Sequence, residues 1–413
     1  MKRRVVITGL GALTPIGHNV NETWENAKNG KNGIDYIKGF DTTDFKVKFA
    51  GEIKDFDVTS VLERKQAKRL DRFVQLALIA TREAVKDCGF NFKEENTDRI
   101  GVYYSSGIGG LKTIADEEDK AQAKGFDRLS PFFIPMAIIN LAPGNIAIDH
   151  NIHGICTSSV TACASATNTI GEAFRAIRDG YLDMAIAGGS EATVTKLGIG
   201  GFDVMHALSR SEDKNRASIP FDKDRSGFVM GEGAGTLILE ELEMALKRGA
   251  KIYGEIVGYG STCDAVHITS PDPNGEGAKR CMELAINDAG LKVEDVDYIN
   301  AHGTSTPLND KTESLAIRRA FKEHVSNINI SSTKSMTGHL LGASGAVEAM
   351  FSVLSTKEDF IAPTINYCEV DEDCNLNYTP NKGVSKTVNV AISNSLGFGG
   401  HNATLVFKKY TGE

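Results

Sequence analysis

The sequence contains no long apolar run and no excess of positive charge. No stretch approaches the roughly 18 consecutive apolar residues that mark a membrane-spanning helix, so we expect no membrane insertion. Lys and Arg number 46 against 54 Asp and Glu, a formal net charge of -8, which argues against a nucleic-acid-binding protein. The 41% of hydrophobic and 24% of charged residues are typical of a globular chain and argue against disorder.

Cysteine is sparse, and its spacing excludes two common uses. The sequence has no CxxC pair, and its seven cysteines are Cys88, Cys156, Cys163, Cys263, Cys281, Cys368 and Cys374. An odd and scattered set predicts neither a disulfide framework nor a thiolate zinc site. We therefore expect no metal at the site of catalysis and a reducing, cytoplasmic location.

The N-terminus copies a signal peptide only in its basic start at residues 1–4. Gly9, Gly11 and Pro15 interrupt the apolar stretch that follows, and no small-residue cleavage pattern comes after it. We expect a first strand at residues 5–8 and then a glycine-rich loop.

Short β-rich runs alternate with amphipathic helical patterns along the chain. The runs lie at residues 5–8, 100–104, 184–187, 252–257, 298–301 and 388–392. This alternation predicts α/β layering.

The chain also repeats itself at long range. Residues 84–90 are echoed by residues 285–291, and both segments end a helical pattern with glycine. A second echo pairs the helix that opens at Ala162-Cys163 with the one that opens at Ala343-Ser344. We expect two halves, residues 1–250 and 251–413.

Cys163 is the most informative residue. It lies in a run of small residues, 159–166, which opens a helical pattern that continues to Asp179-Gly180. A thiol at a helix N-terminus lies near the positive end of the macrodipole, which favours its thiolate. A cysteine among small apolar residues is also compatible with a buried core thiol.

Two histidines lie in segments rich in glycine and hydroxyl residues. His302 lies within residues 300–310 and His339 within residues 334–345. One candidate nucleophile with two histidines is suited to acyl transfer through a thioester. Each histidine, taken singly, is more often a packed or hydrogen-bonded residue than a catalyst.

These three segments closely resemble the Cys-His-His pattern of the β-ketoacyl-acyl carrier protein synthases, the condensing enzymes of fatty acid synthesis. The likeness runs from Val5 to about Lys408 and is closest to the 3-oxoacyl-acyl carrier protein synthase II type. The resemblance implies a thiolase-like fold of five layers, αβαβα, built from two pseudo-equivalent halves and usually forming a homodimer. It also implies acyl carrier protein as partner and no cofactor, because acyl and malonyl thioesters arrive on the carrier's phosphopantetheine arm.

The resemblance further implies a role for each matching residue. Cys163 would accept the acyl chain, and its N–H and that of Phe398 would bind the oxyanion. His302 and His339 would then donate Nε2 hydrogen bonds to the enolate formed when malonyl loses carbon dioxide. A decarboxylative Claisen condensation follows, which elongates the acyl chain by two carbons.

Further residues match supporting positions of the family. Lys334 and Glu348 match a charged pair that holds the histidine loop, although a solvated surface pair is the default for such residues. Thr304 and Thr306 match contacts of the phosphopantetheine arm, or they serve as turn caps. Ile108 matches a residue that ends the acyl pocket and swings aside for long chains, with Phe398 as a gate near the cysteine. An Ile between glycines also fits a plain loop anchor.

One short segment concentrates positive charge. Its basic residues fall within about 140° of a helical wheel and are Arg64, Lys65, Lys68, Arg69 and Arg72. Such a face on an acidic chain favours an acidic protein partner, and the resemblance places carrier docking at Lys65, Lys68 and Arg69. A solvated helix face is the alternative, since Glu63 and Asp71 interrupt the charge.

Four rival functions remain at this point. A polyketide ketosynthase shares the pattern, whereas a thiolase would carry a second cysteine where Phe398 stands. A nucleotide-binding oxidoreductase is suggested by Gly9 and Gly11 after an apolar run, but Thr14-Pro15 interrupts the helix that would cradle a pyrophosphate. A non-catalytic chain-length subunit would lack Cys163.

Overall fold

The computed structural model describes residues 2–412, so Met1 and Glu413, the outer ends of the two expected halves, lie outside the described residues. Five strands of the main sheet come from the first part of the chain: β1 (Val5–Leu13), β4 (Ile100–Ser105), β5 (Cys156–Thr157), β6 (Met184–Glu191) and β7 (Gly233–Glu241). Five come from the second: β8 (Gly254–Cys263), β9 (Tyr298–Asn300), β10 (Asn329–Ser331), β13 (Val390–Gly397) and β14 (His401–Lys408).

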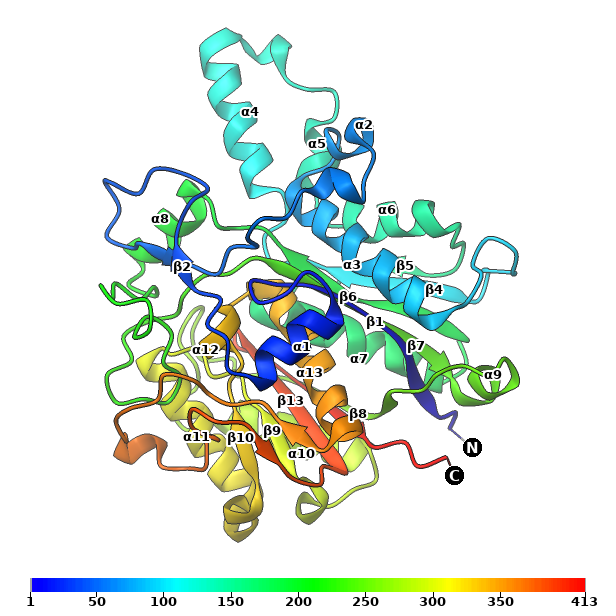
Figure 1. The fold of residues 1–413 in the computed structure, drawn as a ribbon, viewed down its shortest axis with the longest axis vertical. Coiled ribbons are helices and arrows are strands. Elements are labelled where there is room, and N and C mark those ends of the chain that lie inside the picture. The colour runs from blue at the N-terminus through cyan, green and yellow to red at the C-terminus, as the bar shows by residue number, and fades with distance from the viewer. Residues whose placement is uncertain (1, 413) are drawn as a thin grey trace.

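The two sets of strands have the same connectivity. The order is β10-β9-β13-β14-β8-β1-β7-β6-β4-β5 (Figure 1). In each set three strands are parallel (β5-β4-β6 and β10-β9-β13), and the next two are antiparallel. A short antiparallel contact joins the sets, where Val5, Val6 and Ile7 of β1 pair with β8. The expected pseudo-equivalent halves are confirmed.

Helices cover both faces of each strand set and fill the space between the two sets (Figure 1). The helices that do so are α3 (Arg72–Cys88), α6 (Leu141–His150), α7 (Ser165–Arg178), α10 (Glu276–Asp288), α11 (Pro307–Phe321) and α13 (Ser344–Glu358). One apolar core lies between α3, α6 and the first strand set, and another between α10, α11 and the second. A third core surrounds the central pair α7 and α13. These are the five αβαβα layers of the thiolase-like fold.

The described residues also form other helices and strands. They are α1 (Val20–Lys28), α2 (Arg64–Ala67), α4 (Leu111–Lys124), α5 (Phe133–Ala137), α8 (Lys196–Val204), α9 (Leu242–Lys247), α12 (Lys334–Thr337), β2 (Asp35–Tyr36), β3 (Phe49–Ala50), β11 (Phe360–Ile361) and β12 (Val384–Ser385). Helix α4 projects from the body of the molecule (Figure 1). Across residues 2–412, no helix combines the length and apolarity that crossing a membrane requires.

The expected loop after the first strand is wrong, because β1 continues to Leu13. Gly9 and Gly11 lie inside the strand, where an added Cβ would stand 2.4 Å from the Ala84 carbonyl oxygen and 1.8 Å from that of Ala80. These glycines therefore allow the close approach of α3, which explains their spacing without a bound pyrophosphate. The dinucleotide-binding alternative loses its basis.

The same close packing occurs in the second half. A Cβ added to Gly258 or Gly260 of β8 would stand 2.2 Å from a carbonyl oxygen of α10. Gly9 and Gly11 therefore correspond to Gly258 and Gly260 under the internal duplication. The two outer helices also end alike, with Gly89 at φ 66° and Gly290 at φ 67°.

The basic segment does not form one helix. Helix α2 ends at Ala67, and Asp71 begins α3 by accepting the N–H of Phe73. The prediction of a single basic helix face is therefore wrong. Arg72 instead forms two hydrogen bonds with the Glu232 carboxylate, at 2.6 and 2.7 Å.

Candidate active site

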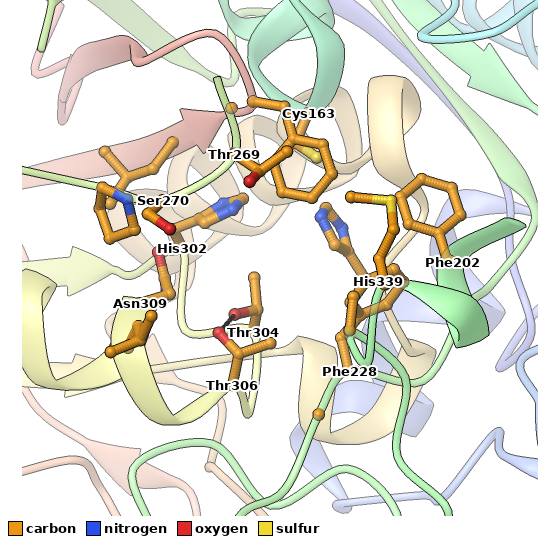
Figure 2. Close-up of a pocket in the computed structure, with 18 of the residues that line it drawn as sticks. Cys163, Phe202, Phe228, Thr269, Ser270, His302, Thr304, Thr306, Asn309 and His339 are labelled. Atoms are coloured by element: carbon orange, nitrogen blue, oxygen red, sulfur yellow. Dashed lines mark hydrogen bonds between the residues drawn. The ribbon is translucent and has the colours of Figure 1, made fainter. Parts of the chain in front are cut away.

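The three candidate catalytic residues line one cavity of about 370 Å³ (Figure 2). Cys163 and Phe228 line it from the first half, and His302 and His339 from the second. The rings of the two histidines lie 5.2 Å apart, centroid to centroid, at an angle of 86°. Segments that are far apart in the sequence therefore meet at one point between the two halves.

The turn that carries Cys163 is unusual in its backbone. Ala162 has a φ of 52°, and residues Ala162–Ala164 form one 3₁₀ turn before α7 begins at Ser165. The Ser165 hydroxyl accepts the N–H of Thr161 at 2.9 Å and donates to the carbonyl of Ala162 at 2.7 Å. The helix expected to open at this place is confirmed, with Cys163 just before its first turn.

A glycine-rich segment near the C-terminus, residues 397–400, lies against this turn. A Cβ added to Gly397 would stand 2.6 Å from the carbonyl oxygen of Thr161 and 3.3 Å from the N atom of Cys163. Only glycine fits there without displacement of the backbone. Phe398 follows directly and lines the cavity, with its ring centroid 6.1 Å from that of Phe202.

The expected lowering of the Cys163 pKa is wrong. Burial is the largest influence and raises the pKa of the thiol to about 12. Lys334 lowers it and Glu191 raises it, so the neighbouring charges largely oppose one another. The helix terminus favours the thiolate, but the loss of solvation outweighs it, and the extent of burial is not visible in the sequence. Without substrate, the thiol is protonated at neutral pH.

His302 is fixed by a buried lysine. The Lys334 ammonium donates to the His302 carbonyl oxygen at 2.6 Å and lies 3.4 Å from its Nδ1. An ammonium has protons and no lone pair, so Nδ1 must be the acceptor and the proton must sit on Nε2. Burial, then Lys334, then His339 lower the pKa of His302 well below its ordinary value.

His339 adopts the same tautomer by a different contact. The N–H of Leu341 donates to His339 Nδ1 at 3.2 Å, and the Ser344 hydroxyl lies 2.9 Å from the same atom. Burial, followed by Lys334, lowers the pKa of His339 well below its ordinary value. Both imidazoles are therefore neutral and carry their proton on Nε2.

Lys334 and Glu348 form a buried ion pair, which rules out the solvated surface alternative. Their side chains are 1% and 3% exposed, and they are joined by a hydrogen bond. Burial raises the pKa of Glu348, and Lys334 opposes this shift. Lys334 contacts the loop of His302, although it lies closer in sequence to His339.

Two buried carboxylates that the sequence argument missed hold the His302 loop. Glu313 accepts the N–H groups of His302 and Gly303, each at 2.8 Å. Asp310 accepts those of Thr304 at 2.9 Å and Ser305 at 3.1 Å. Their positions three and six residues after the start of α11 were visible, but acidic residues in the first two turns of a helix are usually solvated.

Thr304 and Thr306 both line the cavity (Figure 2). Their hydroxyls are hydrogen-bonded to each other at 2.9 Å. Thr306 occupies the N-cap position of α11, yet within the described residues its side chain makes no capping hydrogen bond. The turn-cap alternative is therefore not how this hydroxyl is used.

Ile108 is not among the residues that line the cavity. It packs in an apolar cluster that also contains Cys163, Phe202 and Leu341. The buried Glu191 carboxylate accepts the N–H of Gly107 at 2.7 Å and that of Gly342 at 2.9 Å, and Ile108 N lies 3.3 Å from it. Glu191, which the sequence gave no reason to select, ties the Ile108 loop to the second half.

Lys65, Lys68 and Arg69 are exposed, away from the cavity that holds Cys163. Lys65 and Arg69 border a separate hollow of about 410 Å³ beside α5. The Arg69 guanidinium lies 4.7 Å from the centroid of the Phe132 ring.

Two family models together match most of the chain, up to residue 368. The model of the β-ketoacyl synthase N-terminal domain matches residues 2–245, and that of the C-terminal domain matches residues 253–368. The chain belongs to the β-ketoacyl synthase family. Within this family it is 54% identical to 3-oxoacyl-[acyl-carrier-protein] synthase 2 of Synechocystis sp., over 99% of both chains. It is 52% identical to the synthase of that name from Staphylococcus aureus, again over 99% of both chains.

Solved β-ketoacyl synthase structures superpose over nearly the whole chain. A ketosynthase of type II polyketide synthesis, in complex with its acyl-carrier protein, has a TM-score of 0.91 and 35% identity over 99% of this chain and 100% of its own. A β-ketoacyl synthase from Burkholderia phymatum has a TM-score of 0.90 and 33% identity over 99% and 100%.

Proposed function

We propose that this protein is a 3-oxoacyl-[acyl-carrier-protein] synthase II, which elongates fatty acyl chains by decarboxylative Claisen condensation. The observation that carries the proposal is the convergence of Cys163 with two Nε2-protonated, neutral histidines in one cavity. The high identity to two synthases over whole chains supports the same conclusion.

The first step moves the acyl chain to Cys163. The thiol sulfur attacks the acyl thioester, the carrier's C–S bond breaks, and the thiol proton ends on the sulfur of the released phosphopantetheine arm. The N–H groups of Cys163 and Phe398 bind the oxyanion of the tetrahedral intermediate, a task for which preorganised donors are effective. Thr304 and Thr306 hydrogen-bond the arm during this step.

The second step generates the carbon nucleophile. The bond between the malonyl methylene and its carboxylate breaks, carbon dioxide leaves, and the electron pair moves to the thioester oxygen as an enolate. His302 and His339 donate their Nε2–H groups to that oxygen. The enolate carbon attacks the acyl-Cys163 thioester, the Cys163 thiolate leaves, and a 3-oxoacyl chain remains on the carrier. Lys334 and Glu348 hold the His302 loop in place.

The remaining assignments belong to the same proposal. Acyl carrier protein docks near Lys65, Lys68 and Arg69, and Ile108 limits the acyl pocket. A homodimer is supported by the short edge strand β5 and the exposed apolar side chain of Ile155 beside it. We place the boundary of the halves at 250/251 and the enzyme in the cytoplasm, where the seven free thiols stay reduced.

Mass spectrometry after mixing with acyl-carrier protein tests the proposal. We expect a mass increase equal to the acyl group on the peptide that contains Cys163, followed by its loss when malonyl-carrier is added. Acylation of another cysteine, or none, would contradict the assignment.

A polyketide-type ketosynthase is the second candidate, favoured by the close superposition on the polyketide ketosynthase. Product analysis separates the two functions. With malonyl-carrier in excess, we expect one extension per acyl chain, whereas a polyketide enzyme would release chains that carry several successive keto groups.

A further inference from the structure

A buried chain of polar side chains supports the Cys163 turn from behind, and it begins in the other half of the molecule. Tyr259 of β8 donates its hydroxyl proton to Asn168 Oδ1 at 2.5 Å. Asn168 Nδ2 donates in turn to the Thr161 hydroxyl at 2.7 Å. The Thr161 carbonyl accepts the N–H of Ala164 at 3.1 Å, which closes the turn around Cys163. This brace (Tyr259, Asn168 and Thr161) therefore ends two residues before the nucleophile.

The position of Tyr259 leaves its ring little freedom. A Cβ added to Gly171 of α7 would stand 2.3 Å from the ring, so the tyrosine lies directly on the helix backbone. The Arg175 guanidinium lies 4.4 Å from the ring centroid and donates to the Tyr259 carbonyl at 3.0 Å. Burial raises the pKa of Tyr259 to about 12, so the phenol keeps the proton that it donates to Asn168.

The internal duplication supplies a comparison for the brace. Ser165 corresponds to Ser344, and Gly9 and Gly11 correspond to Gly258 and Gly260, which sets the register between the two copies. The counterparts of Thr161, Asn168, Gly171 and Tyr259 are then Leu340, Val347, Met350 and Leu10. All four counterparts are buried in the central apolar core. A chain of buried hydrogen bonds is thus present in the copy that carries the cysteine and replaced by apolar packing in the other.

We propose that Tyr259, Asn168 and Thr161 are positioning residues for the nucleophile. A non-glycine residue such as Ala162 stays in the left-handed region only where its surroundings hold it there. In the first half the brace and the Ser165 hydroxyl supply that restraint, whereas apolar packing does so around Leu341 in the second half. The Cys163 sulfur and its N–H thereby keep their places beside Gly397. The inference deepens the proposed function and rests on it, because it concerns the acylation step.

The test uses variants that delete one hydroxyl and retain shape. Thr161→Val and Tyr259→Phe break the brace, Thr161→Ser retains its hydroxyl, and Tyr104→Phe is the matched control. Tyr104 is also fully buried, and its hydroxyl lies 3.2 Å from Thr236 Oγ1 in a separate core. Three rates are measured in each variant: transfer of an acyl group from its carrier to Cys163, alkylation of Cys163 by iodoacetamide, and decarboxylation of malonyl-carrier.

We expect Thr161→Val and Tyr259→Phe to slow acylation and alkylation of Cys163 about tenfold, the effect of one lost buried hydrogen bond. The double variant should be about as slow as either single one, because both act through the same chain. In the brace variants the rate of decarboxylation should stay within about twofold of wild type, since the hydrogen bonds that fix the histidines do not involve the brace. In Thr161→Ser and Tyr104→Phe all three rates should stay within about twofold of wild type.

Two results overturn the positioning role: unchanged acylation in both brace variants, or acylation and decarboxylation that decline together. A wild-type enzyme that never acylates Cys163 overturns the proposed function instead. In that case the iodoacetamide rates decide on the brace alone, since slower alkylation in the variants supports it and equal rates overturn it.

Discussion

The turns Ala162–Ala164 and Leu341–Ala343 are two copies of one structure with different tasks. Each is a 3₁₀ turn that begins with a left-handed residue, Ala162 at φ 52° and Leu341 at φ 46°, and each leads into a central helix. The first presents the Cys163 thiol. In the second the corresponding residue is Gly342, where a Cβ would stand 2.1 Å from the Gly107 N atom. The second copy therefore has no room for a nucleophile.

The serines that begin the two helices show how the tasks diverged. The Ser165 hydroxyl bonds to its own turn, at Thr161 and Ala162, and so holds the cysteine. The Ser344 hydroxyl instead reaches Nδ1 of His339. The comparison teaches that the backbone sets where a side chain can act, while a few polar contacts decide which chemistry each half performs. Acyl transfer would belong to the first half and decarboxylation to the second.

The largest effect expected from this division is that of Cys163→Ala. Acyl transfer should fall to background, because the attacking sulfur is gone, while malonyl decarboxylation continues. The free energy of unfolding should change by about 1 kcal/mol or less, since the change in volume is small. Mass spectrometry and urea denaturation measure the two outcomes. Cys281→Ala, a buried cysteine outside the cavity, is the control, and condensation that survives Cys163→Ala would refute the mechanism.

His302→Ala and His339→Ala test the role of the second half in decarboxylation. Each should slow decarboxylation by roughly 100- to 1000-fold, as expected for the loss of one oxyanion donor. Acylation of Cys163 should be much less affected. Release of carbon dioxide and single-turnover acylation are measured side by side. If both variants lose acylation and decarboxylate normally, the assignment of tasks to the two halves is reversed.

Charge reversal at Lys65, Lys68 and Arg69 should affect both steps alike, because both use a carrier-bound substrate. At low salt we expect association to slow by about tenfold or more and the salt dependence to flatten. Acyl-pantetheine, which lacks the carrier, should react at the wild-type rate. Reversal of three other exposed lysines, Lys247, Lys292 and Lys382, is the control. Equal losses with both substrate types would indicate damage to the fold.

Ile108→Phe sharpens the comparison within the first half, because it should affect acylation according to chain length. Each methylene that no longer finds an apolar site loses about 0.8 kcal/mol, roughly a fourfold change in rate. Short primers should acylate Cys163 normally, and discrimination should rise with chain length. Ile108→Leu conserves volume and is the control. A variant that slows all chain lengths equally would remove Ile108 from the pocket.

The smallest expected effect is on the pH dependence of the free energy of unfolding, through the two histidines of the second half. His302 and His339 have lowered pKa values, so below about pH 6.5 the unfolded chain binds protons that the folded protein does not. Their contribution to stability is therefore present above that pH and is lost as the pH falls. Each histidine lowers the free energy of unfolding by up to about 1.4 kcal/mol for every pH unit below 6.5.

The measurement is the urea midpoint between pH 7.5 and 5.5, in wild type and in a His302→Asn/His339→Gln variant. Burial raises the pKa of Glu83 and of Glu313 to about 7, so both carboxyls act in the opposite direction and lose their contribution as the pH rises. The difference between the two proteins isolates the histidines. Identical pH profiles would contradict the neutral assignment.

Much of the fold was predictable from local patterns. The alternation of strands and helices, the glycines that end α3 and α10, and the repetition of the α7 start at α13 all depend on neighbours in the sequence. The structure shifts the register of this repeat by two residues, since Ser165 corresponds to Ser344. The basic segment shows the limit of such patterns. A helical wheel assumes an unbroken helix, and Asp71 begins a new one by accepting the N–H of Phe73. Asp71 was visible as an interruption of the positive charge, but the pattern did not show that its side chain caps a new helix.

The sequence by itself determined which residues were available: one cysteine before a helix, two histidines in glycine-rich segments, and two related halves. Tertiary structure decided their chemical state. Burial, which depends on the packing of both halves, raised the pKa of Cys163 where the helix terminus alone predicted a lowered value. Contacts with Lys334 and Leu341 selected the Nε2 tautomers of the two histidines. Tyr259 of the second half supports the Cys163 turn of the first half through hydrogen bonds. Solvation and long-range hydrogen bonds depend on distances in space, which the order of residues along the chain does not specify.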